Sequence, residues 1–217
     1  MFSSPSAAPR RIGIMGGSFD PIHVAHVALG ETAMKHLQLD EVRWVPVGVP
    51  WQKARQLAPA IDRVEMVRLA TRHEPCFVVD TIEVDRGGPS YTIETFRTLR
   101  AREPAGTEWF LIIGQDQYAN LPTWQGWEDL LQGLTLAVAR RGHERPNPPP
   151  AMQGLAYRVA ELPLPALEIS SSQVRQRLAE GAGPESLTPG MVAPAVARYI
   201  ADHQLYAPGH PPLNGHP

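Results

Sequence analysis

The chain alternates short β-rich runs with segments of helical periodicity, and this alternation constrains its fold more than any other feature. The predicted strands are residues 11–15, 42–47, 77–84, 109–113, 134–139 and 157–162. The predicted helices are residues 23–37, 62–73, 92–102, 124–131, 171–180 and 189–203. Strands that alternate with helices typically form a parallel sheet covered on both faces. We therefore expect an α/β fold with a doubly wound, Rossmann-like parallel sheet.

The chain has 217 residues, which is enough for one domain with a sizeable core. Its hydrophobic share of 43% and charged share of 19% are typical of a globular protein. The 23 prolines gather near both ends and in residues 145–150. We expect a disordered N-terminal extension over residues 1–10, a single domain over 11–206 with a helical part from about 165, and a disordered proline-rich tail over 207–217.

Charge and cysteine content exclude several classes of function. A net charge of -2 gives no general field for holding nucleic acid or an anionic membrane. The single cysteine, Cys76, rules out a disulfide framework and a thiolate zinc site within the chain. No apolar run has the length of a membrane span or the form of a signal peptide. We expect a cytoplasmic protein without nucleic-acid or membrane partners, and the sequence leaves its oligomeric state open, a homo-oligomer included.

Two glycines follow the first predicted strand directly, in the stretch GGSFDPIHVAH (16–26). Without a Cβ, Gly16 and Gly17 allow backbone N–H groups to approach a ligand closely. The start of the following helix adds free N–H groups and a partial positive charge, which favour a phosphate. The spacing matches neither the dinucleotide fingerprint nor the P-loop. The glycines alone are therefore a weak indication of a phosphate site.

Two histidines in the same stretch strengthen this indication. His23 and His26 are three residues apart at the start of the predicted helix, next to the face that carries Leu29 and Ala33. Such histidines can be hydrogen-bonded core residues, phosphate ligands or zinc ligands. No third ligand lies at a suggestive spacing, so we favour phosphate contact over metal binding.

The stretch ISSSQVR (169–175) predicts a second helix start near the C-terminus. One of its serines is expected to be the N-cap. Arg175 would lie in the first turn, where the helix dipole disfavours a cation. This arginine therefore indicates a nearby carboxylate or a bound phosphate, although a solvated arginine on a surface helix fits the stretch equally well.

Together, these two stretches resemble the paired signatures of the nucleotidyltransferase superfamily that carries a histidine-x-x-histidine motif. Within that superfamily the chain resembles the bacterial nicotinate-nucleotide adenylyltransferases. Three further stretches support this family: WVPVGVPWQK (44–53), GPSYTIET (88–95) and FLIIGQDQYANLPTWQGW (110–127). The resemblance extends from about residue 11 to 206. It implies transfer of the adenylyl group of ATP to nicotinate mononucleotide in NAD biosynthesis, by direct in-line attack without a covalent intermediate.

The resemblance also implies roles on the ATP side. The histidines would contact the ATP phosphates, with His26 near the α-phosphate. Lys53 would neutralise phosphate charge from a loop, although it could equally be a solvated lysine. Backbone contacts would come from Gly16, Gly17, Ser18 and Phe19, and the β- and γ-phosphates would meet Ser171 and Arg175. Mg²⁺ would arrive on the triphosphate, since no clustered carboxylates suggest a metal site made wholly by the protein.

On the acceptor side, the resemblance implies that the backbone amide of Thr92 receives the nicotinate carboxylate. Trp124 would stack on the pyridine ring, although Trp124, Trp127 and Leu131 also have the spacing of core residues on a helix. We assign Trp127 to the core and Trp124 to the ligand because of the resemblance. Asp116 would meet the adenosine ribose, its alternative role being a helix N-cap.

The chain departs from the family pattern at four places. Ala25 replaces a glycine between the histidines, and Gln52 stands where the loop usually carries histidine. Gln125 replaces an aromatic residue and Ser172 a threonine. Two alternatives remain open: an enzyme that uses nicotinamide mononucleotide or both acceptors, and a nucleotide sensor of the same fold without catalysis.

Overall fold

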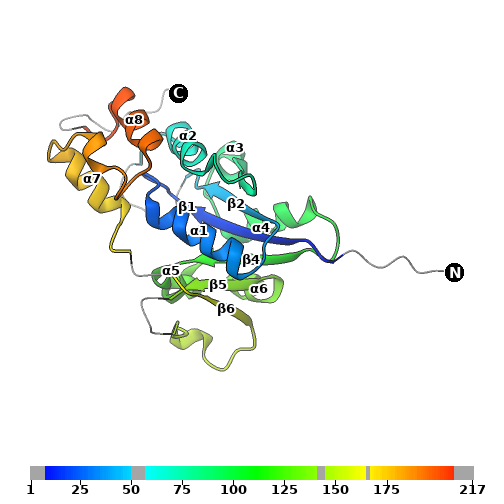
Figure 1. Ribbon diagram of the computed structural model, residues 1–217. Helices are drawn as coiled ribbons and strands as arrows, with labels where there is room; N and C mark the ends of the chain where they lie inside the picture. The colour runs from blue at the N-terminus through cyan, green and yellow to red at the C-terminus, as the bar shows by residue number, and fades with distance from the viewer. Residues whose placement is uncertain (1–7, 50–56, 141–144, 165–166, 208–217) are drawn as a thin grey trace.

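The computed structural model describes residues 8–49, 57–140, 145–164 and 167–207 (Figure 1). Six strands form one parallel sheet in the order β3-β2-β1-β4-β5-β6. They are β1 (Arg11–Gly17), β2 (Glu41–Pro46), β3 (Phe77–Val79), β4 (Glu108–Ile113), β5 (Thr135–Ala139) and β6 (Arg158–Leu162). The strand order reverses between β1 and β4, and parallel sheets bind ligands outside the strand ends at such a point.

Helices cover both faces of the sheet, as Figure 1 shows. The α-helices are α1 (Val24–His36), α2 (Ala60–Thr71), α3 (Ile82–Arg86), α4 (Thr92–Ala101), α5 (Gln115–Asn120), α6 (Trp127–Gly133), α7 (Ser171–Ala179) and α8 (Pro194–Asp202). Three 3₁₀ turns are η1 (Leu121–Thr123), η2 (Pro150–Met152) and η3 (Pro184–Leu187). The expected doubly wound, Rossmann-like fold is confirmed.

The strands alternate their side chains between two cores. In β4, Phe110 and Ile112 pack with α1, α2, α7 and α8 on one face. Trp109, Leu111 and Ile113 pack with α4, α5 and α6 on the other. A period of two in burial is what a sheet covered on both faces requires, and it explains the continuous apolar run FLII.

Three of the expected elements have wrong boundaries. The helix predicted over residues 189–203 begins only at Pro194. The strand predicted over residues 77–84 ends at Val79, because the Asp80 carboxylate accepts a hydrogen bond from Ile82 N at 3.0 Å and the chain turns into α3. The helix predicted from residue 124 begins only at Trp127, since Gly126 before it has a left-handed φ of 65°. Trp124 is extended, so the helical spacing argument does not apply to it.

The C-terminal helices belong to the same core as α1 and α2. Tyr199 in α8 donates a hydrogen bond to Asp62 in α2 at 2.8 Å, and Val24 N at the start of α1 donates to Met191 O at 2.9 Å. At the other end of the chain, Arg10 pairs with Glu103 at 2.6 Å. Arg10 thus joins the residue before β1 to the segment after α4.

Candidate active site

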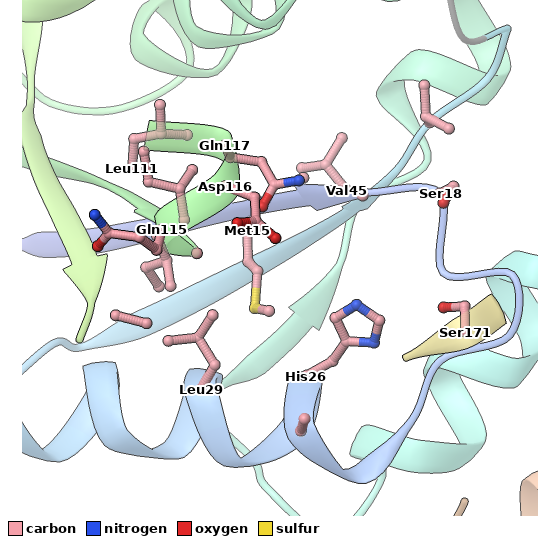
Figure 2. Close-up of a pocket in the computed structure, with 18 of the residues that line it drawn as sticks. Met15, Ser18, His26, Leu29, Val45, Leu111, Gln115, Asp116, Gln117 and Ser171 are labelled. Atoms are coloured by element: carbon pink, nitrogen blue, oxygen red, sulfur yellow. The ribbon is translucent and has the colours of Figure 1, made fainter. Parts of the chain in front are cut away.

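A pocket of about 1060 Å³ opens at the carboxyl ends of β1, β4 and β5, where the strand order reverses. The starts of α1, α4, α5 and α7 form its rim. Figure 2 shows His26 and Leu29 extending from α1 into this pocket, with Met15 at its floor and Asp116 among the residues of α5 that line it. Its volume lies at the upper end of the range of small-molecule binding pockets.

The two glycines are the last residues of β1 rather than the turn itself. A Cβ on Gly16 would meet nothing closer than Val45 O at 4.0 Å, so the pocket floor is open at this point. A Cβ on Gly17 would lie 3.0 Å from the ring of Phe19. Glycine at position 17 thus lets the Phe19 ring fold back under the strand end, although Phe19 itself has an unusual φ of 45°.

Phe19 is 1% exposed and supports the histidines from the core. Its ring meets the edge of the His26 ring with centroids 5.2 Å apart. Gly16, Gly17 and Ser18 line the pocket, whereas Phe19 is not part of its wall. Phe19 therefore differs from the three residues before it: they line the pocket, whereas its ring supports the His26 ring.

The histidines differ in their surroundings. His23 is the N-cap of α1, one residue before the helix, and burial lowers its pKa to about 4. His26 lies in the first turn, and its ring stacks on that of His23 with centroids 3.7 Å apart. Nδ1 of His26 accepts a hydrogen bond from His23 N at 3.3 Å. In the neutral ring the proton is then on Nε2, so that nitrogen is a donor.

The C-terminal stretch joins the pocket through α7. Ser170 is the N-cap, since its hydroxyl accepts a hydrogen bond from Gln173 N at 3.2 Å. Ser171 lines the pocket, and its hydroxyl donates to Pro21 O at 2.9 Å. The serine motif is thereby tied to the turn that precedes α1.

Arg175 is the fifth residue of α7 and so begins its second turn, not the first turn as we expected. Its guanidinium donates to Asp20 O at 2.5 Å and to the Ser172 hydroxyl at 3.0 Å. The Asp20 carboxylate lies 3.9 Å away. The nearby anion indicated by the sequence is thus present as Asp20, and Arg175 is not part of the pocket wall.

A further part of the pocket wall comes from α4, which packs on the other face of the sheet from α1, and from the segment after α5. Thr92 is the first residue of α4, and the helix's own hydrogen bonds begin with Glu94 N and Thr95 N, which both donate to Tyr91 O. The N–H of Thr92 therefore lies outside the helical ladder, at the positive end of the helix dipole. Trp124 and Trp127 both pack against the adjacent core, and of these two only Trp124 also lines the pocket.

Asp116 lines the pocket from the second position of α5, and the N-cap of that helix is Gly114. Its alternative role as an N-cap is therefore wrong. Lys53 and its neighbours Trp51 and Gln52 lie outside the described residues.

Sequence reasoning missed Arg63, a buried cation beside the site. Its guanidinium donates to Ser18 O at 2.9 Å, Val47 O at 2.7 Å and Ala58 O at 2.9 Å. It thereby joins the turn after β1 to the segment after β2. A further hydrogen bond from the same guanidinium reaches Gly48 O at 3.4 Å. No sequence signal pointed to this role, because these acceptors are backbone carbonyls.

Asp20 was also missed as a site residue, and it is fully buried. Its Oδ1 accepts hydrogen bonds from Tyr206 OH at 2.7 Å and Ala58 N at 3.2 Å. The Asp-Pro pair within the first motif was a possible signal, since its place next to the histidines was visible in the sequence.

Among residues 8–49, 57–140, 145–164 and 167–207, no three histidine, cysteine or acidic side chains gather as a metal site would require. In the same part of the chain, no helix is both long and apolar enough to span a membrane.

Comparisons with known proteins agree with this architecture. The family model described as cytidylyltransferase-like matches residues 14–177. A protein of Methylibium petroleiphilum named "Probable nicotinate-nucleotide adenylyltransferase" is 48% identical over 204 residues, which cover 94% of this chain and 96% of the relative. The chain belongs to the nicotinate-nucleotide adenylyltransferase family. A relative of the same name from Bordetella avium is 44% identical, over 92% of this chain and 99% of its own.

Solved structures support the same fold. The nicotinic acid mononucleotide adenylyltransferase of Plasmodium falciparum, complexed with APC, has a TM-score of 0.74 at 20% identity, over 91% of this chain and 97% of that chain. A structure of that enzyme complexed with NaAD has a TM-score of 0.72. The family resemblance drawn from the sequence motifs is confirmed, and with it the class of enzyme, a nucleotidyltransferase. ATP-using enzymes of this kind generally need a divalent metal.

Proposed function

We propose that this chain transfers the adenylyl group of ATP to nicotinate mononucleotide, which yields nicotinate adenine dinucleotide and pyrophosphate in NAD biosynthesis. The names of its relatives support the reaction. The observation that carries the proposal is the layout of one pocket, with His23 and His26 at one end and the start of α4 with Trp124 at the other. Two nucleotides bound end to end would meet between them.

The reaction needs alignment and charge stabilisation rather than a nucleophilic side chain. An oxygen of the acceptor phosphate attacks the α-phosphorus of ATP, and the bond from that phosphorus to the bridging oxygen of pyrophosphate breaks. Negative charge develops on the phosphate oxygens, where donors held in advance are most effective. His26 has this position: its Nδ1 is an acceptor for His23 N, so its Nε2–H donates to an oxygen of the α-phosphate.

His23 acts as a neutral donor to the phosphates, because burial keeps its pKa near 4. The backbone at Gly16, Gly17 and Ser18 approaches the nucleotide where no Cβ intervenes. Phe19, which we expected to offer a backbone contact, contributes by fixing His26.

The β- and γ-phosphates lie at the start of α7. Ser171 offers a backbone N–H there, since its hydroxyl is directed to Pro21 O. Arg175 provides positive charge from behind this turn, through its contact with Asp20. Lys53 neutralises phosphate charge from outside the described residues.

On the acceptor side, the N–H of Thr92 at the start of α4 receives the nicotinate carboxylate, and Trp124 stacks on the pyridine ring. A helix N-terminus favours an anion, so the carboxylate binds better than the uncharged amide of nicotinamide mononucleotide. Asp116 accepts hydrogen bonds from the adenosine ribose. Mg²⁺ enters with ATP as part of the substrate, and the cytoplasm is the place of action.

A pyrophosphate-coupled assay with ATP, Mg²⁺ and a panel of mononucleotide acceptors tests the proposal. We expect pyrophosphate release that depends on nicotinate mononucleotide. Tight ATP binding without pyrophosphate release from any acceptor would instead support a nucleotide sensor.

A further inference from the structure

Glu83 is a buried acidic residue at the acceptor end of the pocket, and the proposed reaction makes no use of it. It belongs to α3, is 7% exposed and lines the pocket together with Ser90, Thr92 and Thr95. An ionisable group buried beside an anion-binding helix start is unexpected, because a second negative charge repels the ligand there.

Two hydroxyl groups donate hydrogen bonds to this carboxylate. Thr95 Oγ1 donates to Oε1 of Glu83 at 2.7 Å, and the Ser90 side chain is hydrogen-bonded to Glu83 as well. Each hydroxyl is itself an acceptor: Arg86 donates to Thr95 Oγ1 at 3.3 Å, and Gly48 N donates to Ser90 Oγ at 3.2 Å. Since a hydroxyl has only one proton, these upstream donors direct both protons toward Glu83.

The electrostatic effects on Glu83 oppose one another. Burial has the largest effect and raises the pKa of Glu83 above its usual value, whereas the hydrogen bonds from Thr95 and Ser90 and the positive charge of Arg86 act in the opposite direction and favour the ionised form. In its ionised form the carboxylate can accept both hydroxyl protons at once, which a protonated acid or an amide cannot do with the same geometry.

The two hydroxyls lie on either side of the proposed carboxylate contact. Ser90 comes two residues before Thr92 in the chain, and Thr95 follows it in the first turn of α4. Ser90 N also donates to Val49 O at 3.0 Å, which ties this segment to the residues after β2. One carboxylate thus anchors the backbone before and after Thr92, whose N–H lies outside the helical ladder.

The backbone around Glu83 is packed too closely to move independently. A Cβ on Gly48 would lie 2.3 Å from Glu83 O, so the segment after β2 rests directly on α3. Glu83 therefore lies where α3, the start of α4 and the segment after β2 meet.

We propose that Glu83 is a positioning residue that holds the start of α4 in the orientation in which its N–H groups receive the acceptor carboxylate. It acts through Ser90 and Thr95 and makes the enzyme selective for a carboxylate acceptor over an amide. This inference rests on the proposed function, since it needs nicotinate mononucleotide at that end of the pocket.

Steady-state kinetics of Glu83→Gln test the proposal, with each substrate varied in turn. The amide keeps the size of the side chain, but its NH₂ group can only donate. It would face a hydroxyl that already accepts a hydrogen bond from an N–H group. We expect kcat/KM for nicotinate mononucleotide to fall about 10- to 100-fold, as for other small misplacements of binding groups. The KM for ATP should change less than about twofold, since the phosphate end is held separately, and the preference for nicotinate over nicotinamide mononucleotide should shrink.

Glu94→Gln is the matched control, because Glu94 also lies in the first turn of α4 but is 46% exposed in its side chain and 3.8 Å from Arg86. It should leave all constants unchanged. Thr95→Val removes the donor while keeping its shape, so it should reproduce the acceptor effect, and Thr95→Ser should restore selectivity relative to Thr95→Val. If Glu83→Gln does not fold, this valine–serine pair carries the test.

The outcomes are separable. An unchanged acceptor KM and an unchanged acceptor preference in Glu83→Gln and Thr95→Val would overturn the inference. Equal losses for ATP and acceptor together with early thermal unfolding would also overturn it, because they indicate general support of the fold. If the wild-type chain releases no pyrophosphate with nicotinate mononucleotide, the proposed function itself fails.

Discussion

Tyr206→Phe removes the hydroxyl group that joins the segment after α8 to Asp20, at the phosphate end of the pocket. Tyr206 OH donates to Oδ1 of Asp20 at 2.7 Å, and Asp20 is fully buried. Burial and the Asp20 charge both raise the pKa of Tyr206, so the hydroxyl stays protonated and remains a donor at working pH. The backbone oxygen of Asp20 in turn accepts a hydrogen bond from Arg175 at 2.5 Å.

The magnitude follows from the charge of the acceptor. A hydrogen bond to an ionised group contributes about 1.5–3 kcal/mol. For a domain of this size each kcal/mol lowers Tm by about 2–4 °C, so we expect a decrease of about 3–12 °C. Because the shift of Asp20 also releases Arg175, the KM for ATP should rise while that for the acceptor stays constant.

Thermal unfolding and ATP-saturation kinetics measure both effects. Tyr199→Phe is the control: its hydroxyl also donates to a carboxylate, Asp62 at 2.8 Å, but that pair lies between α8 and α2 and away from the pocket. By the same rule it should cost about 1.5–3 kcal/mol, and it should leave the KM for ATP unchanged. If Tyr206→Phe has the same Tm and the same KM for ATP as the wild type, this hydrogen bond does not hold Asp20 in place.

Three other predictions concern the phosphate end. His26→Ala should lower kcat by about 10²–10³ with the fold intact, and near-normal turnover would remove His26 from the mechanism. Folding lowers the pKa of His23 from 6.5 to about 4, so between these pH values only the unfolded chain binds a proton at this residue. The free energy of unfolding should therefore fall by up to about 3 kcal/mol as the pH drops from 6.5 to 4. In urea unfolding, His23→Gln should lack this part of the pH dependence. Arg63→Met removes the donor to the carbonyls of Ser18, Val47 and Ala58 and should cost at least about 3 kcal/mol in urea unfolding. Arg68→Met, which is half exposed in the same helix, should change stability by less than about 0.5 kcal/mol.

The fold was predictable because its signals are local. Each buried strand is a short apolar run, and each surface helix repeats its apolar residues at helical spacing, so the order of elements could be read along the chain. The errors arose where a single residue turns the backbone. Asp80 ends β3 through its bond to Ile82 N, and Gly126 delays α6 until Trp127.

The phosphate end was predictable in part. Gly17 and His26 lie within one short motif, and helix geometry alone places the histidine near the strand ends. The partners that fix this motif could not be predicted, since they are remote: Tyr206 is 186 residues from Asp20, and Arg63 is 45 residues from Ser18. Pairings over such separations depend on the finished fold rather than on local pattern.

The acceptor end was predictable only through the family resemblance. Helical spacing alone favoured Trp124 as a core residue, and in the structure it packs against the core and also lines the pocket. Glu83 had no signal at all, because it lies in a segment expected to be a strand.

The most direct test of the account is the ratio of kcat/KM for nicotinate mononucleotide to that for nicotinamide mononucleotide, with the dinucleotide products quantified by chromatography and mass spectrometry. The uncharged amide of nicotinamide mononucleotide would leave the N–H groups at the start of α4 without an anionic partner. This should make the ratio at least about 10, a difference of about 1.4 kcal/mol. A ratio near one, or a preference for the amide, would contradict the assignment of the acceptor site to Thr92.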